Sequence, residues 1–156
     1  MTQYNRGSQR GGNNPPAPQF QKPSDDEIKK IIVNGDVELL VKLAERAGEA
    51  LAVQKLTTSQ IRNVFGTVRQ IQMRWPTAPE KSYREAVLLR PKLAYFAERE
   101  KKSKGGGSAG METLQVVLEP ALKLLSDTGQ PNQERFERFA ELFEAIVAYH
   151  KKHGGK

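Results

Sequence analysis

Apolar residues recur along most of this chain at intervals that match the turn of an α-helix. In the clearest stretch they fall at the i, i+3, i+4 and i+7 positions, which places them on one stripe of a helix. The residues of that stripe are Ile61, Val64, Phe65, Val68, Ile71 and Trp75. Alternation of apolar and polar residues nowhere runs long enough to predict a strand. The predicted fold class is therefore all-α, a compact bundle of about five or six helices.

Several helix ends can be located from the residues that cap them. The spacing of a capping box occurs at Ser24 with Glu27 and at Thr57 with Gln60. Further N-cap candidates are Asp36 and Asn132. Gly154 can close the last helix, because glycine readily takes the left-handed conformation found there. Pro91 either begins a new helix in its first turn or kinks a continuous one.

Two segments lack any helical pattern. Residues 1–23 contain three basic and no acidic residues among many Gly, Pro, Asn and Gln, and we predict a disordered basic tail. Residues 103–110 include Gly-Gly-Gly-Ser-Ala-Gly and are predicted to be a flexible linker. The remaining sequence, 24–156, is expected to form a single helical domain.

The positive charge is concentrated in the middle third of the chain. The formal net charge is +7, and residues 54–104 carry 12 basic against 4 acidic residues. Arg62 and Arg69 are seven residues apart, so they project from nearly the same side of a helix, about 10 Å apart; Lys92 and Arg99 share this spacing. Such a stripe could follow a phosphate backbone. A solvated face, or pairing with the acidic first and last helices, remains the alternative.

The positions of four aromatic and histidine residues indicate which of them can be exposed for binding. Trp75 lies on the apolar stripe and is expected in the core. For Tyr95 a core or half-buried position is favoured over stacking on a base, which stays the alternative. His150 and His153 lie near a helix end, where we expect them to face solvent or to complement the helix dipole.

The sequence contains no pattern that indicates catalysis. Cysteine is absent, two histidines cannot form a metal site, and no phosphate-binding glycine motif follows a strand. We therefore expect no enzyme activity, no metal and no cofactor. Apolar runs are shorter than the roughly 20 residues that span a bilayer, and the N-terminus lacks a signal-peptide core, so we expect a cytoplasmic protein without a membrane partner.

Three blocks of sequence carry a family resemblance. They are Leu-Thr-Thr-Ser-Gln-Ile-Arg at 56–62, Leu-Arg-Pro-Lys-Leu-Ala-Tyr at 89–95 followed by Arg99, and Glu-Ala-Ile-Val-Ala-Tyr-His-Lys at 144–151 preceded by Phe136 and Phe139. In their order and spacing they resemble the small subunit of the Csm effector complex of type III-A CRISPR systems. The resemblance spans about residues 44–155.

This resemblance implies a helical, non-catalytic RNA-binding subunit. It would be present in several copies along the duplex of guide RNA and target RNA, with other Csm complex subunits and further copies of itself as partners. RNA contact is carried over to Arg62, Lys92 and Arg99, and the helical geometry adds Arg69. The complete set of predicted RNA-binding residues is Lys55, Arg62, Arg69, Lys92, Tyr95 and Arg99.

Two other functions remain open from the sequence. One is a structural protein–protein interaction module with no direct nucleic-acid contact, whose basic face is only solvated. The other is a DNA-binding helix-turn-helix regulator, which the sequence favours less because the helix after the turn at 76–79 has no clear base-reading face.

Overall fold

Seven helices make up the part of the chain that the computed structural model describes, which is residues 20–101 and 108–156. They are α1 (Asp25–Ile32), α2 (Val37–Val53), α3 (Thr58–Arg74), α4 (Pro79–Val87), α5 (Leu89–Lys101), α6 (Ser108–Leu125) and α7 (Gln133–Lys152). These residues include no strand, which confirms the all-α prediction. Only Leu88 separates α4 from α5, and this break accounts for one helix more than the sequence predicted.

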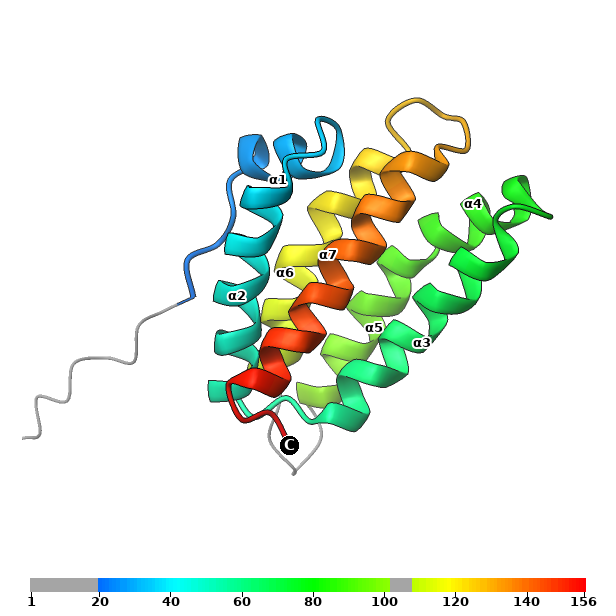
Figure 1. The fold of residues 1–156 in the computed structure, drawn as a ribbon. Helices are drawn as coiled ribbons and strands as arrows, with labels where there is room; N and C mark the ends of the chain where they lie inside the picture. The colour runs from blue at the N-terminus through cyan, green and yellow to red at the C-terminus, as the bar shows by residue number, and fades with distance from the viewer. Residues whose placement is uncertain (1–19, 102–107) are drawn as a thin grey trace, which may run out of the picture.

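The helices surround α6 and α7, which lie together in the middle of the bundle (Figure 1). Helix α7 packs against α2 on one side and α3 on the other, while α6 packs against α2 and α5. Helices α1 and α2 therefore lie on one flank of the bundle, and α3, α4 and α5 lie on the other. This places the basic middle third of the sequence on one flank.

The predicted helix ends are largely present. Asp36 and Asn132 accept from backbone N–H groups three residues on, and Thr57 forms a complete capping box with Gln60. Ser24 accepts from the Glu27 N–H, but the Glu27 carboxylate pairs with Arg46 instead of completing the box. Pro91 lies in the first turn of α5, the first of the two predicted alternatives.

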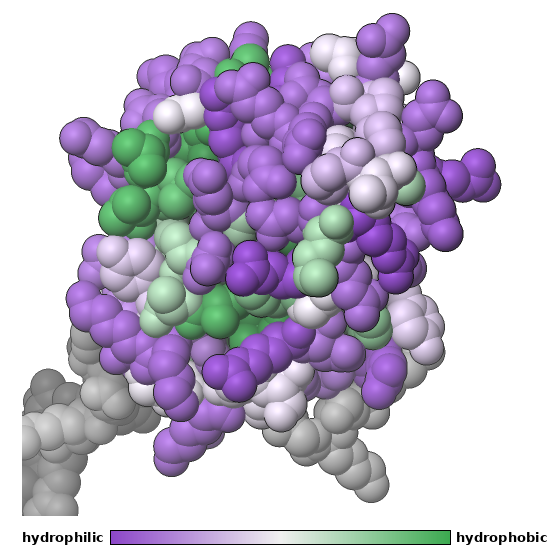
Figure 2. Space-filling view, turned by 45° about the vertical axis from the view of Figure 1, so that its right-hand side comes forward, coloured by the Kyte–Doolittle hydropathy of each residue, from purple (hydrophilic) through white to green (hydrophobic). Residues whose placement is uncertain are grey.

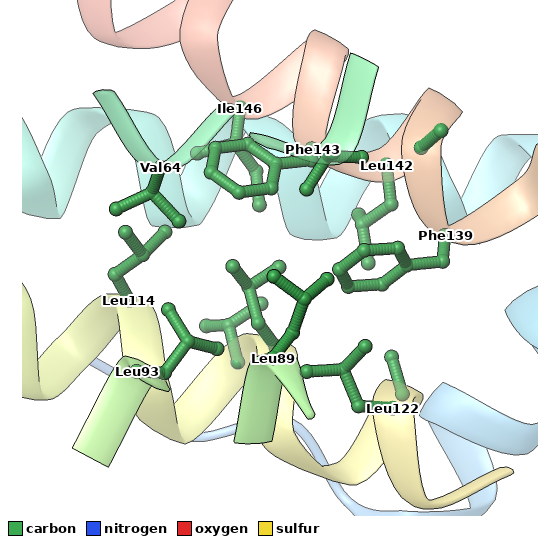
Figure 3. Close-up of a cluster of buried hydrophobic side chains, with 14 of the residues drawn as sticks. Val64, Leu89, Leu93, Leu114, Leu122, Phe139, Leu142, Phe143 and Ile146 are labelled. Carbon is green, nitrogen blue, oxygen red and sulfur yellow. The ribbon is translucent and has the colours of Figure 1, made fainter. Parts of the chain in front are cut away.

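Aromatic and aliphatic side chains from most of the helices fill one core. Figure 3 shows Phe139, Phe143 and Ile146 of α7 facing Leu93 of α5 and Leu114 of α6. Near the start of α7, Phe136 stacks on Trp75, with 4.8 Å between ring centroids. Trp75 is only 2% exposed, as expected for a core residue.

Helices α2 and α7 approach each other closely at a glycine. A Cβ atom on Gly48 would lie 2.6 Å from Tyr149 Cβ and 2.7 Å from the backbone nitrogen of His150. No real Cβ atom makes such contacts, so this crossing depends on the missing side chain.

The position of His150 differs from the expectation of a solvent-facing residue. Its side chain is buried, and Nε2 lies 2.6 Å from the carbonyl oxygen of Leu56 in the connection between α2 and α3. Gly155 packs directly against the imidazole ring. His150 follows Phe143 by seven residues, so it falls on the buried face of α7, while His153 is exposed as predicted.

The structure describes only the ends of the two segments that were predicted to be flexible, and those ends are ordered. Residues 1–19 of the expected tail lie outside the described residues, but 20–23 pack on the bundle: Pro23 is buried, and Arg46 donates to the carbonyl of Gln21 at 3.0 Å. Residues 103–107 of the expected linker also lie outside the described part. Residues 108–110 form the first turn of α6, where Gly110 packs against Leu56.

Candidate nucleic-acid interface

Arg62 of α3 and Arg99 of α5 line the same groove, which has a volume of about 650 Å³. The groove lies between the N-terminal half of α3 and the C-terminal half of α5, so the two helices run antiparallel there. Two arginines that are 37 positions apart in the sequence thus share one surface. Packing between helices thus brings together one member of each of the two predicted pairs of basic residues.

The groove changes from apolar at its base to cationic at its edge. Its floor consists of the buried side chains Val64 and Met111. The walls are the half-buried residues Gln60, Phe96 and Glu100, and the rim consists of the exposed residues Ser59, Arg62, Asn63 and Arg99. A ligand with a flat apolar part and an anionic part would match this order of layers.

Gln60 ties the two walls together. Its Oε1 accepts from the backbone N–H of Thr57 at 2.9 Å, as part of the capping box. Its Nε2 donates to Oε2 of Glu100 on α5, also at 2.9 Å. The same amide therefore closes the start of α3 and links α3 to α5.

The exposed face of α5 carries three of the predicted residues. Lys92, Tyr95 and Arg99 occur at i, i+3 and i+7, and all three are exposed. Tyr95 is 63% exposed and its ring lies 5.9 Å from the ring of Phe96, so the favoured core or half-buried position for Tyr95 is wrong. The face thus combines two cations with a pair of neighbouring aromatic rings.

Arg69 and Lys55 lie apart from this groove. Arg69 donates to Oε1 of Gln72 at 3.3 Å and lies 5.5 Å from the centre of the Phe65 ring, on the side of α3 that faces α7. Lys55 adopts a positive φ of 63° in the connection between α2 and α3 and lines a second hollow beside Lys156. The equal azimuth of Arg62 and Arg69 therefore does not give them a shared groove.

The arginines of the bundle divide into paired and unpaired groups. The ion pairs are Arg46–Glu27, Arg74–Glu85, Arg90–Glu119, Arg135–Asp127 and Arg138–Glu134. Within residues 20–101 and 108–156, Arg62, Lys92 and Arg99 form no ion pair. These three cations are free to bind an external anion, while the paired arginines hold the helices together.

The surface around α3 and α4, which Figure 2 brings forward, is mainly hydrophilic. In the described part of the chain no three His, Cys, Asp or Glu side chains are placed to hold a metal ion. The same residues include no helix that is both long and apolar enough to cross a bilayer.

Comparison with known families identifies the group to which the chain belongs. A family model described as Csm2 Type III-A matches residues 34–156, which include all the groove residues. The chain is a member of the Csm2 family. Csm2 proteins are structural small subunits of the Csm complex, so the partners of this Csm2-family chain include other Csm subunits. Neither a curated protein nor a solved structure matches it.

Several residues of the groove are absent from the predicted RNA-binding set, and two of them come from α5. Phe96 and Glu100 form its α5 wall, but neither was predicted to take part in binding. The helical spacing contains a signal for Phe96, because it follows Lys92 by four residues and precedes Arg99 by three. No comparable signal identifies Glu100, whose position depends on its hydrogen bond to Gln60 across the groove.

Proposed function

We propose that this Csm2-family chain is a non-catalytic subunit that holds the RNA backbone in an RNA-guided surveillance complex. Several copies would stack along the duplex of guide RNA and target RNA, each presenting the surface of α3 and α5 to phosphates. Base pairing supplies sequence specificity in guided systems, so the protein only needs to bind the shape and charge of the backbone.

The observation that carries this proposal is that Arg62, Lys92 and Arg99 form no ion pair with the described part of the chain. Arg62 and Arg99 lie on one groove and Lys92 lies two turns before Arg99 on the same face of α5. Guanidinium groups suit phosphate because their planar N–H donors can form two parallel hydrogen bonds to it. Side chains already engaged with carboxylates would have to break those contacts first, and these three do not.

A salt titration with a matched control tests the proposal. The double variant Arg62→Gln/Arg99→Gln removes two groove cations, while Lys42→Gln/Lys123→Gln removes two exposed cations from α2 and α6. Log affinity for single-stranded RNA falls with log salt by about 0.7 per phosphate contact. With three contacts, from Arg62, Lys92 and Arg99, affinity should fall about 20-fold between about 50 and 200 mM salt.

The groove variant, with one contact left, should lose only about 3-fold over the same salt range, for every RNA sequence alike. Fluorescence anisotropy of a labelled RNA measures both slopes. The control variant should keep the slope of the unaltered chain, although its net charge equals that of the groove variant. Equal slopes for the two variants would contradict the assignment of RNA contact to this groove.

A purely structural interaction module is supported by a different observation. Val37 and Val41 of α2 are 62% and 41% exposed, and Val37 borders a hollow lined by Glu134, Glu137 and Glu141 of α7. Under this function, Val37→Ser/Val41→Ser should prevent incorporation into the Csm complex regardless of salt. Incorporation is read by co-purification with the other Csm subunits, and normal incorporation would exclude this surface.

A further inference from the structure

We propose that the groove between α3 and α5 holds one unpaired nucleotide of RNA, with its base inside the groove and its phosphate at the rim. The inference rests on the proposed RNA-binding function. It adds contact with a base to the contacts with the backbone, and so defines the substrate of the groove as unpaired rather than fully duplex RNA.

The size and lining of the groove fit such a ligand. A volume of about 650 Å³ lies within the range of pockets that bind small molecules, and it can accommodate a nucleotide. The floor of Val64 and Met111 is apolar, and Phe96 contributes an aromatic wall. Aromatic side chains bind single-stranded nucleic acid by stacking on the faces of its bases. A base within a duplex is already stacked, so only an unpaired base can enter.

The carboxylate in the wall fixes the orientation of the nucleotide. Glu100 lines the groove, and its Oε2 accepts from Gln60, which leaves Oε1 as a further acceptor. A carboxylate repels a phosphate but accepts from the N–H groups on the pairing edge of a base. The phosphate therefore belongs at the exposed rim beside Arg62 and Arg99, and the base belongs beside Glu100.

The aromatic pair on α5 extends the stacking surface outward. Tyr95 and Phe96 are tilted by 55° to each other, and Tyr95 is the more exposed ring. Tyr95 also lies within one turn of both Lys92 and Arg99 on the α5 surface. A neighbouring base can pack on Tyr95 while its phosphate is held by Lys92.

Three RNA ligands test the inference with the full-length chain. The first is a duplex with one bulged nucleotide, the second is the same duplex with an abasic bulge, and the third is fully paired. We expect the bulged duplex to bind about tenfold more tightly than either of the others, in line with the contribution of one stacked base. Anisotropy at a fixed salt concentration measures the three affinities.

The variant Phe96→Leu separates base contact from backbone contact. It retains an apolar side chain but removes the ring, so we expect the preference for the bulged duplex to disappear while the salt slope stays unchanged. Phe20→Leu, at a half-buried phenylalanine that lies over Arg46 on α2, is the matched control and should keep both properties.

The outcomes distinguish the inference from the function on which it rests. Equal affinity for all three RNA ligands with a normal salt slope would overturn the nucleotide site and leave backbone binding intact. Loss of the salt slope, or no binding of any RNA at low salt, would instead overturn the proposed function. A thermal unfolding curve identical to that of the unaltered chain shows that Phe96→Leu is folded; if it is not, Phe96→Met provides the same test.

Discussion

Two helical glycines should respond in opposite ways to the same substitution. Gly66 lies in the middle of α3, and a Cβ atom added there would meet no atom within 4 Å. Alanine favours the helical state over glycine by about 1 kcal/mol, so Gly66→Ala should stabilise the protein by about that amount. For a chain of this size, the midpoint of thermal unfolding should rise by about 2–4 °C.

Gly48→Ala also replaces a glycine in a helix by a better helix former, but the added methyl group would collide with α7. The new Cβ would lie 2.6 to 2.8 Å from three atoms of Tyr149 and His150, two of which belong to the α7 backbone. Carbon atoms in contact normally stay about 3.5–4.0 Å apart, so α2 and α7 would have to separate by about 1 Å. Overpacking of this kind typically costs about 1–3 kcal/mol and at times more. We therefore expect a net loss of about 2 kcal/mol in the free energy of unfolding.

Urea denaturation of both variants and of the unaltered chain measures the two changes in the free energy of unfolding. The loss of helix is followed by far-ultraviolet circular dichroism. The decisive quantity is the sign. If Gly48→Ala stabilised the chain as Gly66→Ala does, the close crossing of α2 and α7 would not exist in solution.

Three further substitutions separate stability from binding. Arg138→Ala removes the donor to the last carbonyls of α1, at 3.2 and 2.8 Å, so it should lower the free energy of unfolding by about 1–3 kcal/mol and leave RNA affinity unchanged. Arg62→Ala should do the reverse, with a stability change within about 0.5 kcal/mol and weaker RNA binding. Thr57→Ala should cost about 1 kcal/mol by removing the N-cap of α3. Chemical denaturation and anisotropy check these three variants, and RNA binding that follows stability in all of them would contradict the division of roles.

The local parts of this fold could be predicted from the sequence. The N-caps at Asp36, Thr57 and Asn132 involve groups within four residues of each other, and such interactions need no knowledge of the remaining chain. The apolar spacing of α3 likewise identified the buried face, including Trp75. Both depend on the helical repeat alone.

The groove depends on information that the helical repeat does not contain. Spacing places Arg62 and Arg69 on one side of α3, but Arg62 lines the groove with residues of α5, whereas Arg69 lies beside Phe65 and Gln72 of its own helix. The hydrogen-bond partner of His150 could not be predicted for the same reason, because Leu56 is 94 positions away in the sequence. Which helices become neighbours is decided by packing of the whole bundle.

The two hydrogen bonds of the Gln60 side chain limit which substitutions the groove can tolerate. Because the side-chain amide of Gln60 both caps the start of α3 and bonds to Glu100 on the opposite wall, the width of the groove depends on the stability of the first turn of α3. Thr57→Ala, which need not touch any ligand, would remove the hydroxyl that accepts from the Gln60 backbone N–H and so loosen the turn that holds this amide. Changes that tune recognition here are therefore constrained by local folding, and a glutamate at position 60 would set two carboxylates against each other.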